Sequence, residues 1–337
     1  MEVNSHRISS VLFESPDKSL VVLDIPTSLE ESQVLPSQIP RRRIVSAEPP
    51  ATPYPTPEPR HGGGDHSAFA TASPGAQLAE LMTTETVSSA LQDLASTYSY
   101  SGPFHRGRFV QPQQQPPSVS ALPPLIPDKA EFLNGSIEAM RDSFHMSAPK
   151  FDLVVLDPPW PNRSARRKTD KYATVPNLKE MRNLLLQIPL ASHLTPDGLV
   201  AVWVTNKHSI HDFLTSSTGL FAAWGLEVVT EWTWLKVAAS GEPLYDVEST
   251  WRKPWEKLII AKRFGSKKPD ALESKVIVAV PDVHSRKPNL RGLFQDVLGK
   301  ECLGLEIFAR NLTAGWWAWG DELLRFQQPE HWHDIEQ

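Results

Sequence analysis

Apolar runs separated by turn residues dominate the chain from about residue 150 onward and predict its secondary structure. Strands are predicted at 151–157, LVAVWVTN from Leu199, LEVVTEWTWLKV from Leu226, EKLIIAKRF from Glu256, KVIVAVP and LGLEIFAR from Leu303, and WWAWG from Trp316 closes the domain. Apolar residues three or four positions apart predict helices at 177–187, 210–215 and 290–298. Near-continuous apolar strands interleaved with helices are typical of an α/β fold with a buried, mostly parallel sheet.

The first 124 residues follow a different pattern. VLFESPDKSLVVLDI contains two apolar runs around a turn, which fits either a β-hairpin or a disordered arm with chance apolar residues. A lone hairpin is marginal in water, so residues 1–33 would need to dock on a larger body. Residues 34–124 are expected to form a Pro-rich, largely disordered linker, interrupted by one weak helix, AQLAELMTTETVSSALQDLAS, that could bind a partner.

Composition supports this division. All 11 tryptophans lie at or beyond Trp160, whereas 18 of the 31 prolines lie at or before Pro127. Pro-rich sequence without aromatic and branched bulk does not offset the entropy of ordering. We therefore expect one globular domain over residues 125–330, followed by a short tail at 331–337.

Charge and cysteine content narrow the functional class. A formal net charge of −5 argues against a broadly basic surface for nucleic acid, but it leaves room for a local basic groove. The single cysteine excludes an internal disulfide and a CxxC zinc site, and no metal site is predicted. No apolar run approaches the roughly 20 residues of a membrane helix, and MEVNSHRISS lacks a secretory apolar segment. We expect a soluble intracellular protein, in which Arg41–Arg43 is either part of a nuclear-import signal or a solvated cluster.

The sequence FDLVVLDPPWPNRSARR, from Phe151, carries the clearest chemistry. An amine on an aromatic ring, such as adenine N6, is a poor nucleophile because its lone pair is delocalised. Two hydrogen-bond acceptors on its N–H groups would orient that lone pair, and Asp157 with the Pro158 carbonyl could supply them. Trp160 could stack on the base. The alternative is a strand that ends in an Asx-Pro turn, with Trp160 covering the sheet edge.

LDPPWPNRSARR resembles the catalytic motif of the MT-A70-like adenine N6-methyltransferases, and within that family it is most similar to the methyltransferase-like protein 4 branch. The resemblance covers roughly residues 125–330 and includes AVWVTN, EWTWLKV, RKPWEKLIIAKR, VPDVHSRKPNL and LEIFARNLTAGWWAWGDELLRFQ in the family order. It implies a Rossmann-like fold whose cofactor half follows the catalytic motif, S-adenosyl-L-methionine as cofactor, and a nuclear enzyme, with an additional cytoplasmic location left open. The implied catalytic motif comprises Asp157, Pro158, Pro159 and Trp160.

An acid at the end of a strand, such as Glu306, commonly accepts hydrogen bonds from ribose hydroxyls, although it could equally cap a helix. The resemblance implies a cofactor site formed by Ser136, Ile137, Asp157, Lys287, Glu306, Ile307, Arg310, Asn311, Asp321 and Glu322. In this set Ile137 would stack on the cofactor adenine and Lys287 would meet its carboxylate. Two positions depart from the family pattern, because Ser136 replaces an aspartate and Asp321 replaces an asparagine. Both changes put cofactor affinity in doubt.

The chain turns basic directly after the motif. Arg163, Arg166, Arg167 and Lys168 either form solvated surface or position the phosphates of a nucleic acid strand. Because adenine N6 is inaccessible in a stacked duplex, the adenosine should be single-stranded or flipped out. The predicted contacts to the base and its flanks are Asn162, Asn206 and Trp255, although a loop tryptophan is at least as often packing.

These observations predict an S-adenosylmethionine-dependent adenine N6-methyltransferase. The resemblance favours RNA, including a small nuclear RNA with a 2′-O-methyladenosine, over DNA. The alternative from another class is a catalytically silent RNA-binding scaffold, which only Ser136 and Asp321 support. The oligomeric state is left open, and a monomer is compatible with the sequence.

Overall fold

A ten-stranded sheet organises the computed structural model, which describes residues 9–55, 74–98, 102–111, 122–161, 175–249 and 252–335. Across the sheet the order is β1 (Val11–Glu14), β2 (Leu20–Leu23), β9 (Lys275–Ala279), β7 (Leu226–Lys236), β8 (Trp255–Arg263), β6 (Leu194–Val204), β5 (Phe151–Leu156), β10 (Gly304–Ile307), β11 (Trp317–Gly320) and β4 (Glu131–Asn134). Only β1 and β8 run antiparallel to their neighbours in this sheet. The predicted α/β class with a mostly parallel sheet is confirmed, and the arrangement is that of a Rossmann-like methyltransferase fold.

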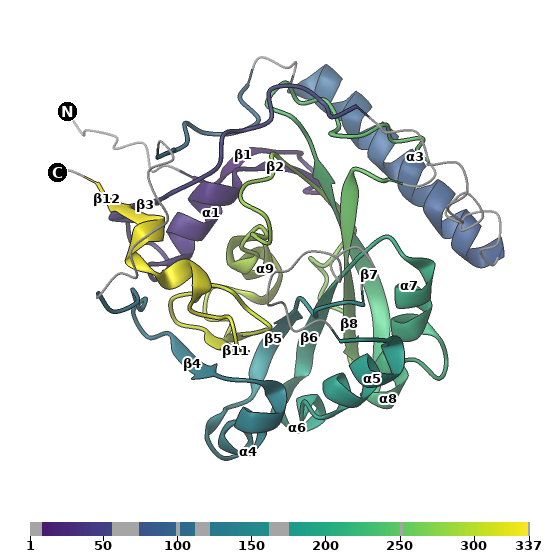
Figure 1. The fold of residues 1–337 in the computed structure, drawn as a ribbon. Coiled ribbons are helices and arrows are strands. Elements are labelled where there is room, and N and C mark those ends of the chain that lie inside the picture. The colour runs from purple at the N-terminus through teal and green to yellow at the C-terminus, as the bar shows by residue number, and fades with distance from the viewer. Residues whose placement is uncertain are drawn as a thin grey trace.

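Helices cover both faces of this sheet (Figure 1). One face packs against α4 (Ile137–Ser147), α5 (Leu178–Leu186), α6 (Leu190–His193), α7 (His208–Thr215) and α8 (Leu220–Ala223). The other face packs against α1 (Ile25–Ser32) and α9 (Arg291–Leu298). A longer helix, α3 (Pro74–Thr97), lies over β2, β7 and β9. Within the described residues, no helix is both long and apolar enough to cross a bilayer.

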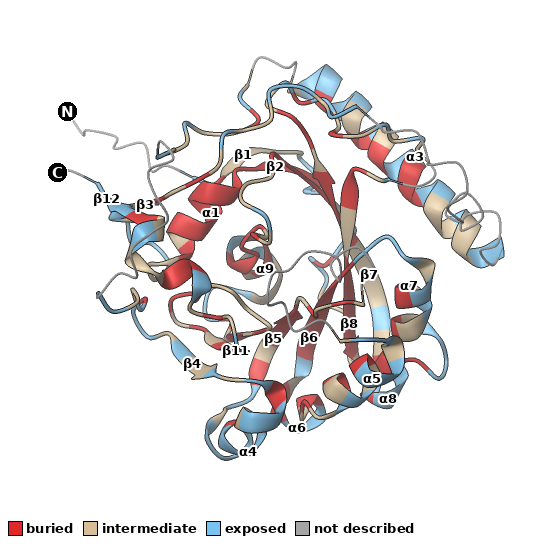
Figure 2. Ribbon diagram, in the orientation of Figure 1, coloured by how far each residue is buried: buried red, intermediate tan, exposed pale blue. Residues whose placement is uncertain are grey.

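The central strand β5, the second half of β6 and β9 are mostly apolar because both of their faces are buried. In β9, Ile277 faces the α1 and α9 side, whereas Val278 faces α3. The central strands are accordingly coloured as buried almost throughout (Figure 2). Side chains that alternate between two covered faces explain why these segments lack a polar face in the sequence.

The N-terminal segment is part of this core. Leu20–Leu23 pairs with β1 as a hairpin and runs parallel to β9 on its other side, with Leu20 opposite Val276. The helix α1, which the sequence analysis did not predict, follows directly. Its N-terminus is capped by Asp24, whose side chain accepts a hydrogen bond from the Thr27 backbone N–H at 3.0 Å, and it has a proline in its first turn.

The expectation of a largely disordered linker at 34–124 differs from what the described parts of that range show. Arg42–Ile44 forms β3, which pairs antiparallel with β12 (Trp332–Asp334), so residues 331–335 are also more than a tail. Two short 3₁₀ helices, Arg325–Gln327 and Pro329–His331, lead into β12. Arg42 and Arg43 form ion pairs with Asp334 and Glu30, unlike a freely solvated import signal. A few large apolar anchors in Pro-rich sequence are enough to hold these segments on the core.

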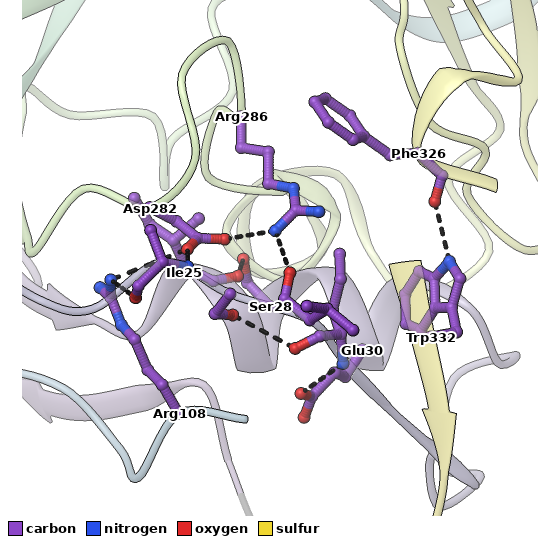
Figure 3. A network of polar contacts seen from close by, with 12 residues as sticks. Ile25, Ser28, Glu30, Arg108, Asp282, Arg286, Phe326 and Trp332 are labelled. Carbon is purple, nitrogen blue, oxygen red and sulfur yellow. Dashed lines mark hydrogen bonds and ion pairs between the residues drawn. The ribbon is translucent and has the colours of Figure 1, made fainter. Parts of the chain in front are cut away.

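Buried ion pairs connect these segments to the loop after β9. Asp282 accepts a hydrogen bond from Arg286 Nη1 at 2.7 Å, and its other oxygen lies 3.7 Å from Arg108 Nη1 (Figure 3). Arg286 Nη1 also donates to the Val45 carbonyl, and Arg108 donates to the Ala47 carbonyl. All three charged side chains are buried, with the Asp282 carboxylate between the two guanidinium groups, and these contacts fix the loop in place.

Replacement of Ile25 in α1 tests whether the N-terminal segment belongs to the core. Ile25 is fully buried, so Ile25→Ala should lower the free energy of unfolding by about 2–5 kcal/mol in urea denaturation. Ile39→Ala is the matched control, because Ile39 is 70% exposed and its truncation should cost less than about 0.5 kcal/mol. Equal, small effects of both changes would mean that α1 is only loosely attached.

Candidate active site

Several of the predicted functional residues that the structure describes lie at one edge of the sheet. Strands β4, β11, β10, β5 and β6 are parallel, so their carboxyl ends share that edge. Asp157 follows β5, Glu306 lies next to the last residue of β10, and Asn206 follows β6. In open α/β sheets, ligands bind beyond the carboxyl ends of the strands. The candidate site is therefore at the position that this fold favours.

Asp157 lies between two cations that come from different loops. Its Oδ1 is 3.4 Å from Lys287 Nζ, and its Oδ2 is 3.4 Å from Arg310 Nη1. The Asp157 backbone N–H donates to the Ile307 carbonyl at 3.3 Å, which continues the β5–β10 pairing past the end of the strand. The carboxylate is thus held by its backbone and by one cation on each oxygen.

Glu256, at the start of β8, stabilises this arrangement by binding Lys287. Sequence reasoning did not predict it as a site residue. It accepts a hydrogen bond from Lys287 Nζ at 2.6 Å and also pairs with Lys236. Burial alone would raise the pKa of Glu256, but the charges of Lys287 and Lys236 lower it to about 2. Burial alone would likewise lower the pKa of Lys287, yet Asp157 and Glu256 raise it above its usual value. The available signal was an acid just before the apolar run Leu258–Ala261 of this strand.

Glu306 has a different environment. Among the described residues, no group donates a hydrogen bond to its carboxylate, which lines the same pocket as Asp157 and Lys287. Burial raises the pKa of Glu306 to about 7, and the charge of Arg291 reduces this effect only in part. A largely desolvated carboxylate that faces a pocket is well suited to accept hydrogen bonds from ligand hydroxyls.

The pocket brings together six of the ten residues predicted for the cofactor: Asp157, Lys287, Glu306, Ile307, Arg310 and Asn311. It also contains residues that sequence reasoning missed, namely Leu29 from α1 and Ser285, Pro288, Asn289 and Leu290 from the loop before α9. Leu29 carried no local signal, because its place here depends on docking of the N-terminal segment. The buried Asn289 accepts a hydrogen bond from the Arg291 backbone and donates to Thr313.

The other four predicted cofactor residues lie at the same edge but do not line this pocket. Ile137 is only 2% exposed and packs in the core with Phe144. This buried position differs from the exposed one that stacking on an adenine would require. Ser136 caps α4 by accepting a hydrogen bond from the Ala139 N–H. Asp321 is exposed, whereas Glu322 accepts a hydrogen bond from Arg310 Nε at 3.0 Å. Glu322 therefore acts on the site through Arg310.

The Asp-Pro-Pro-Trp segment forms a tight turn. The Pro158 carbonyl accepts a hydrogen bond from the Trp160 backbone N–H at 2.8 Å, which leaves one of its two lone pairs for another donor. The Trp160 indole donates to the Trp203 carbonyl at 2.8 Å and meets Phe213 edge-on. With 7% of its surface exposed, Trp160 anchors the turn in the core, which differs from the predicted open stacking face.

The predicted substrate contacts are described only in part. Asn162, Arg163, Arg166, Arg167 and Lys168 lie outside the described residues. Asn206 Nδ2 donates to the Trp255 carbonyl at 2.6 Å, and both residues line a second pocket next to the motif. Trp255 is buried, which favours the packing role over an exposed stacking surface.

Comparison with known proteins gives a consistent result. The profile of the MT-A70 family matches residues 151–322. The chain is 51% identical over 331 residues to the N6-methyladenosine RNA methyltransferase MTA1 of Cryphonectria parasitica, covering 96% of this chain and 94% of that protein. It is 34% identical to the N(6)-adenine-specific methyltransferase METTL4 of Homo sapiens over 63% of this chain and 45% of that protein. It is 35% identical to the DNA N6-methyl methyltransferase of Caenorhabditis elegans over 56% of this chain and 49% of that protein.

The raised pKa of Glu306 predicts a pH-dependent stability difference. Because the folded protein holds this proton more tightly than the unfolded chain, the stability contribution of Glu306 falls as pH rises from about 4.5 through about 7. Glu306→Gln should therefore match the native protein at pH 5 and exceed it by roughly 1–3 kcal/mol at pH 8.5 in urea denaturation. The exposed Glu301→Gln is the matched control for the loss of an acid away from the pocket. A constant difference for Glu306→Gln across this range would contradict the assignment.

Proposed function

Because this chain belongs to the MT-A70 family, we propose that it methylates adenine N6 in RNA and takes the methyl group from S-adenosyl-L-methionine. The chain is an adenine N6-methyltransferase that acts on nucleic acid. The choice of RNA is supported by the name of the Cryphonectria parasitica relative, which is similar to this chain over nearly its whole length. The cofactor is supported by the composition of the pocket beside Asp157.

One observation carries the proposal: a single pocket contains Asp157, Glu306, Lys287 and Arg310. The amino-acid end of S-adenosylmethionine requires a cation for its carboxylate, and its ribose requires an acceptor for two hydroxyls. Lys287 and Arg310 provide the cations, and Glu306 provides the acceptor without a competing hydrogen bond from the described residues. The residues present therefore fit this cofactor, which when bound supplies a methyl carbon made electrophilic by its sulfonium.

The chain's own groups would orient the adenine amine. Asp157 accepts one N6–H, and the remaining lone pair of the Pro158 carbonyl accepts the other, so that the nitrogen lone pair points out of the ring plane toward the methyl donor. Positive charge develops on N6 during transfer, and the Asp157 carboxylate stabilises it. The proton released from N6 then leaves to solvent. Orientation and electrostatics provide most of the acceleration.

The finer substrate assignment is also a proposal. We propose an internal 2′-O-methyladenosine of a small nuclear RNA as one substrate to examine, together with a nuclear location. DNA is the competing substrate, since one relative is named a DNA methyltransferase. A catalytically silent RNA-binding scaffold is disfavoured because both hydrogen-bond acceptors of the motif, the Asp157 carboxylate and the Pro158 carbonyl, are present.

Methyl transfer to total RNA and to genomic DNA, followed by nucleoside mass spectrometry, tests the proposal. Purified full-length protein and S-adenosylmethionine with an isotopically labelled methyl group would be supplied to each nucleic acid. We expect labelled N6-methyladenosine or its 2′-O-methyl derivative from RNA. Label found only in DNA would transfer the assignment to DNA, and no label in either would favour the scaffold.

Asp157→Ala isolates the amine-orienting role. We expect methyl transfer to fall by at least about 10²–10³-fold, because one of the two acceptors on N6 is removed. Binding of S-adenosylmethionine, measured by calorimetry, should change much less because Lys287, Arg310 and Glu306 remain. Near-normal turnover of Asp157→Ala would refute the orienting role.

The basic run after the motif predicts electrostatic binding of the strand. Combined Arg166→Ala and Arg167→Ala should weaken binding of single-stranded RNA and reduce the slope of log affinity against log salt by about 1.4, since each phosphate that is no longer neutralised lowers the slope by about 0.7. Fluorescence anisotropy over a salt series measures this slope. An unchanged slope would assign both arginines to solvated surface.

A further inference from the structure

A second pocket lies beside the candidate active site and is lined in part by the N-terminal half of α3. Its walls come from α3, from the end of β6 with α7, and from the start of β8. It adjoins the catalytic turn, because Lys207 Nζ donates a hydrogen bond to the Pro161 carbonyl at 3.1 Å. Neighbouring strands are about 4.8 Å apart, so the end of β6 is one strand away from Asp157 at the end of β5.

Besides Lys207, four basic residues of this pocket fall into two groups. Lys257 and His211 both contact Glu231, an acid of the sheet itself, at 2.9 Å each. Lys253 and His208 instead contact Glu80 of α3, each at 3.1 Å. A single carboxylate on a helix thus serves two basic groups on the wall of the pocket.

Lys253 keeps its position independently of Glu80. Its Nζ also donates to the Val247 carbonyl at 3.2 Å and lies 5.0 Å from the centre of the Trp255 ring. Its side chain is only 9% exposed. A buried ammonium group needs an anion nearby. The contacts with Val247 and Trp255 already position the Lys253 ammonium to pair with an anion other than the Glu80 carboxylate.

The attachment of α3 is uneven along its length. Its C-terminal half buries Val87, Ala90 and Leu94 against β2, β7 and β9. Its N-terminal half buries Thr83 and Thr84 but exposes Leu78, Leu81 and Met82. The apolar anchoring of α3 therefore lies away from Glu80, and the N-terminal turns can shift without exposing the main apolar contacts.

We propose that this pocket binds a backbone phosphate of the substrate strand, and that Glu80 occupies the phosphate position while substrate is absent. Exchange of a carboxylate for a phosphate leaves the Lys253 ammonium paired throughout. A phosphate at this position would flank an adenosine whose base meets Asp157. The inference rests on the proposed function, since it assumes that a nucleic acid strand enters this edge of the sheet.

Three variants of the full-length protein test the exchange, with a short single-stranded RNA containing adenine as the probe. Glu80→Gln should bind the RNA about threefold to tenfold more tightly at low salt, because the competing charge is removed. Lys253→Met keeps the apolar stem and should weaken binding by roughly tenfold, with a salt slope reduced by about 0.7. The double variant should show no gain from Glu80→Gln. Glu85→Gln, at an exposed position of the same helix, is the matched control and should leave affinity unchanged.

The outcomes separate this inference from the proposed function. Unchanged or weaker RNA binding by Glu80→Gln, with a native melting temperature, would overturn the exchange while methyl transfer to RNA remained intact. Equal gains from Glu80→Gln and Glu85→Gln would reveal a general charge effect and would also overturn it. Absence of both RNA binding and methyl transfer in the native protein would instead refute the proposed function itself.

Discussion

The paired charge of Asp157 is the interaction on which the rest of the site depends. A carboxylate at a strand end must be held in one orientation if it is to accept hydrogen bonds from a ligand. Lys287 and Arg310, one on each oxygen, hold it in this way. Glu256 pairs with Lys287, and Glu322 pairs with Arg310. The five charged groups therefore act as one unit, although they come from the loops after β5, β9 and β10, from the start of β8 and from beyond β11. Their geometry exists only when those strands are in register.

The loop that carries Lys287 depends on segments far from it in sequence. Arg286, the preceding residue, is bound by Asp282 and by the Val45 carbonyl, and Arg108 completes the buried group. Val45 and Arg108 lie in the Pro-rich part of the chain, outside residues 151–322 that match the family profile. The catalytic half is therefore shaped by sequence that carries no recognisable motif.

Much of the fold and part of the site could be predicted from the sequence. Strands buried on both faces leave continuous apolar runs, and a rare Asp-Pro-Pro-Trp turn marks its own strand end, so β5 and the position of Asp157 at its end could be predicted. The burial of Ile137 and Trp160 could not, because a motif reports residue identity and says little about how much of a side chain the core encloses. Helix α1 and strand β3 were missed for another reason: they are short, and tertiary contacts rather than local periodicity stabilise them. Glu256 was missed because its partners lie on other strands.

The pairing of β2 with β9 has a consequence for synthesis on the ribosome. Leu20 emerges early, but its partner Val276 is translated only after most of the chain has left the exit tunnel. Until then the hairpin presents an unpaired edge and a row of apolar side chains to the cytosol, a state that favours aggregation. Such distant contacts also slow folding. Nascent chains of this protein should accordingly depend on chaperones that shield an early hydrophobic strand until its late neighbour arrives.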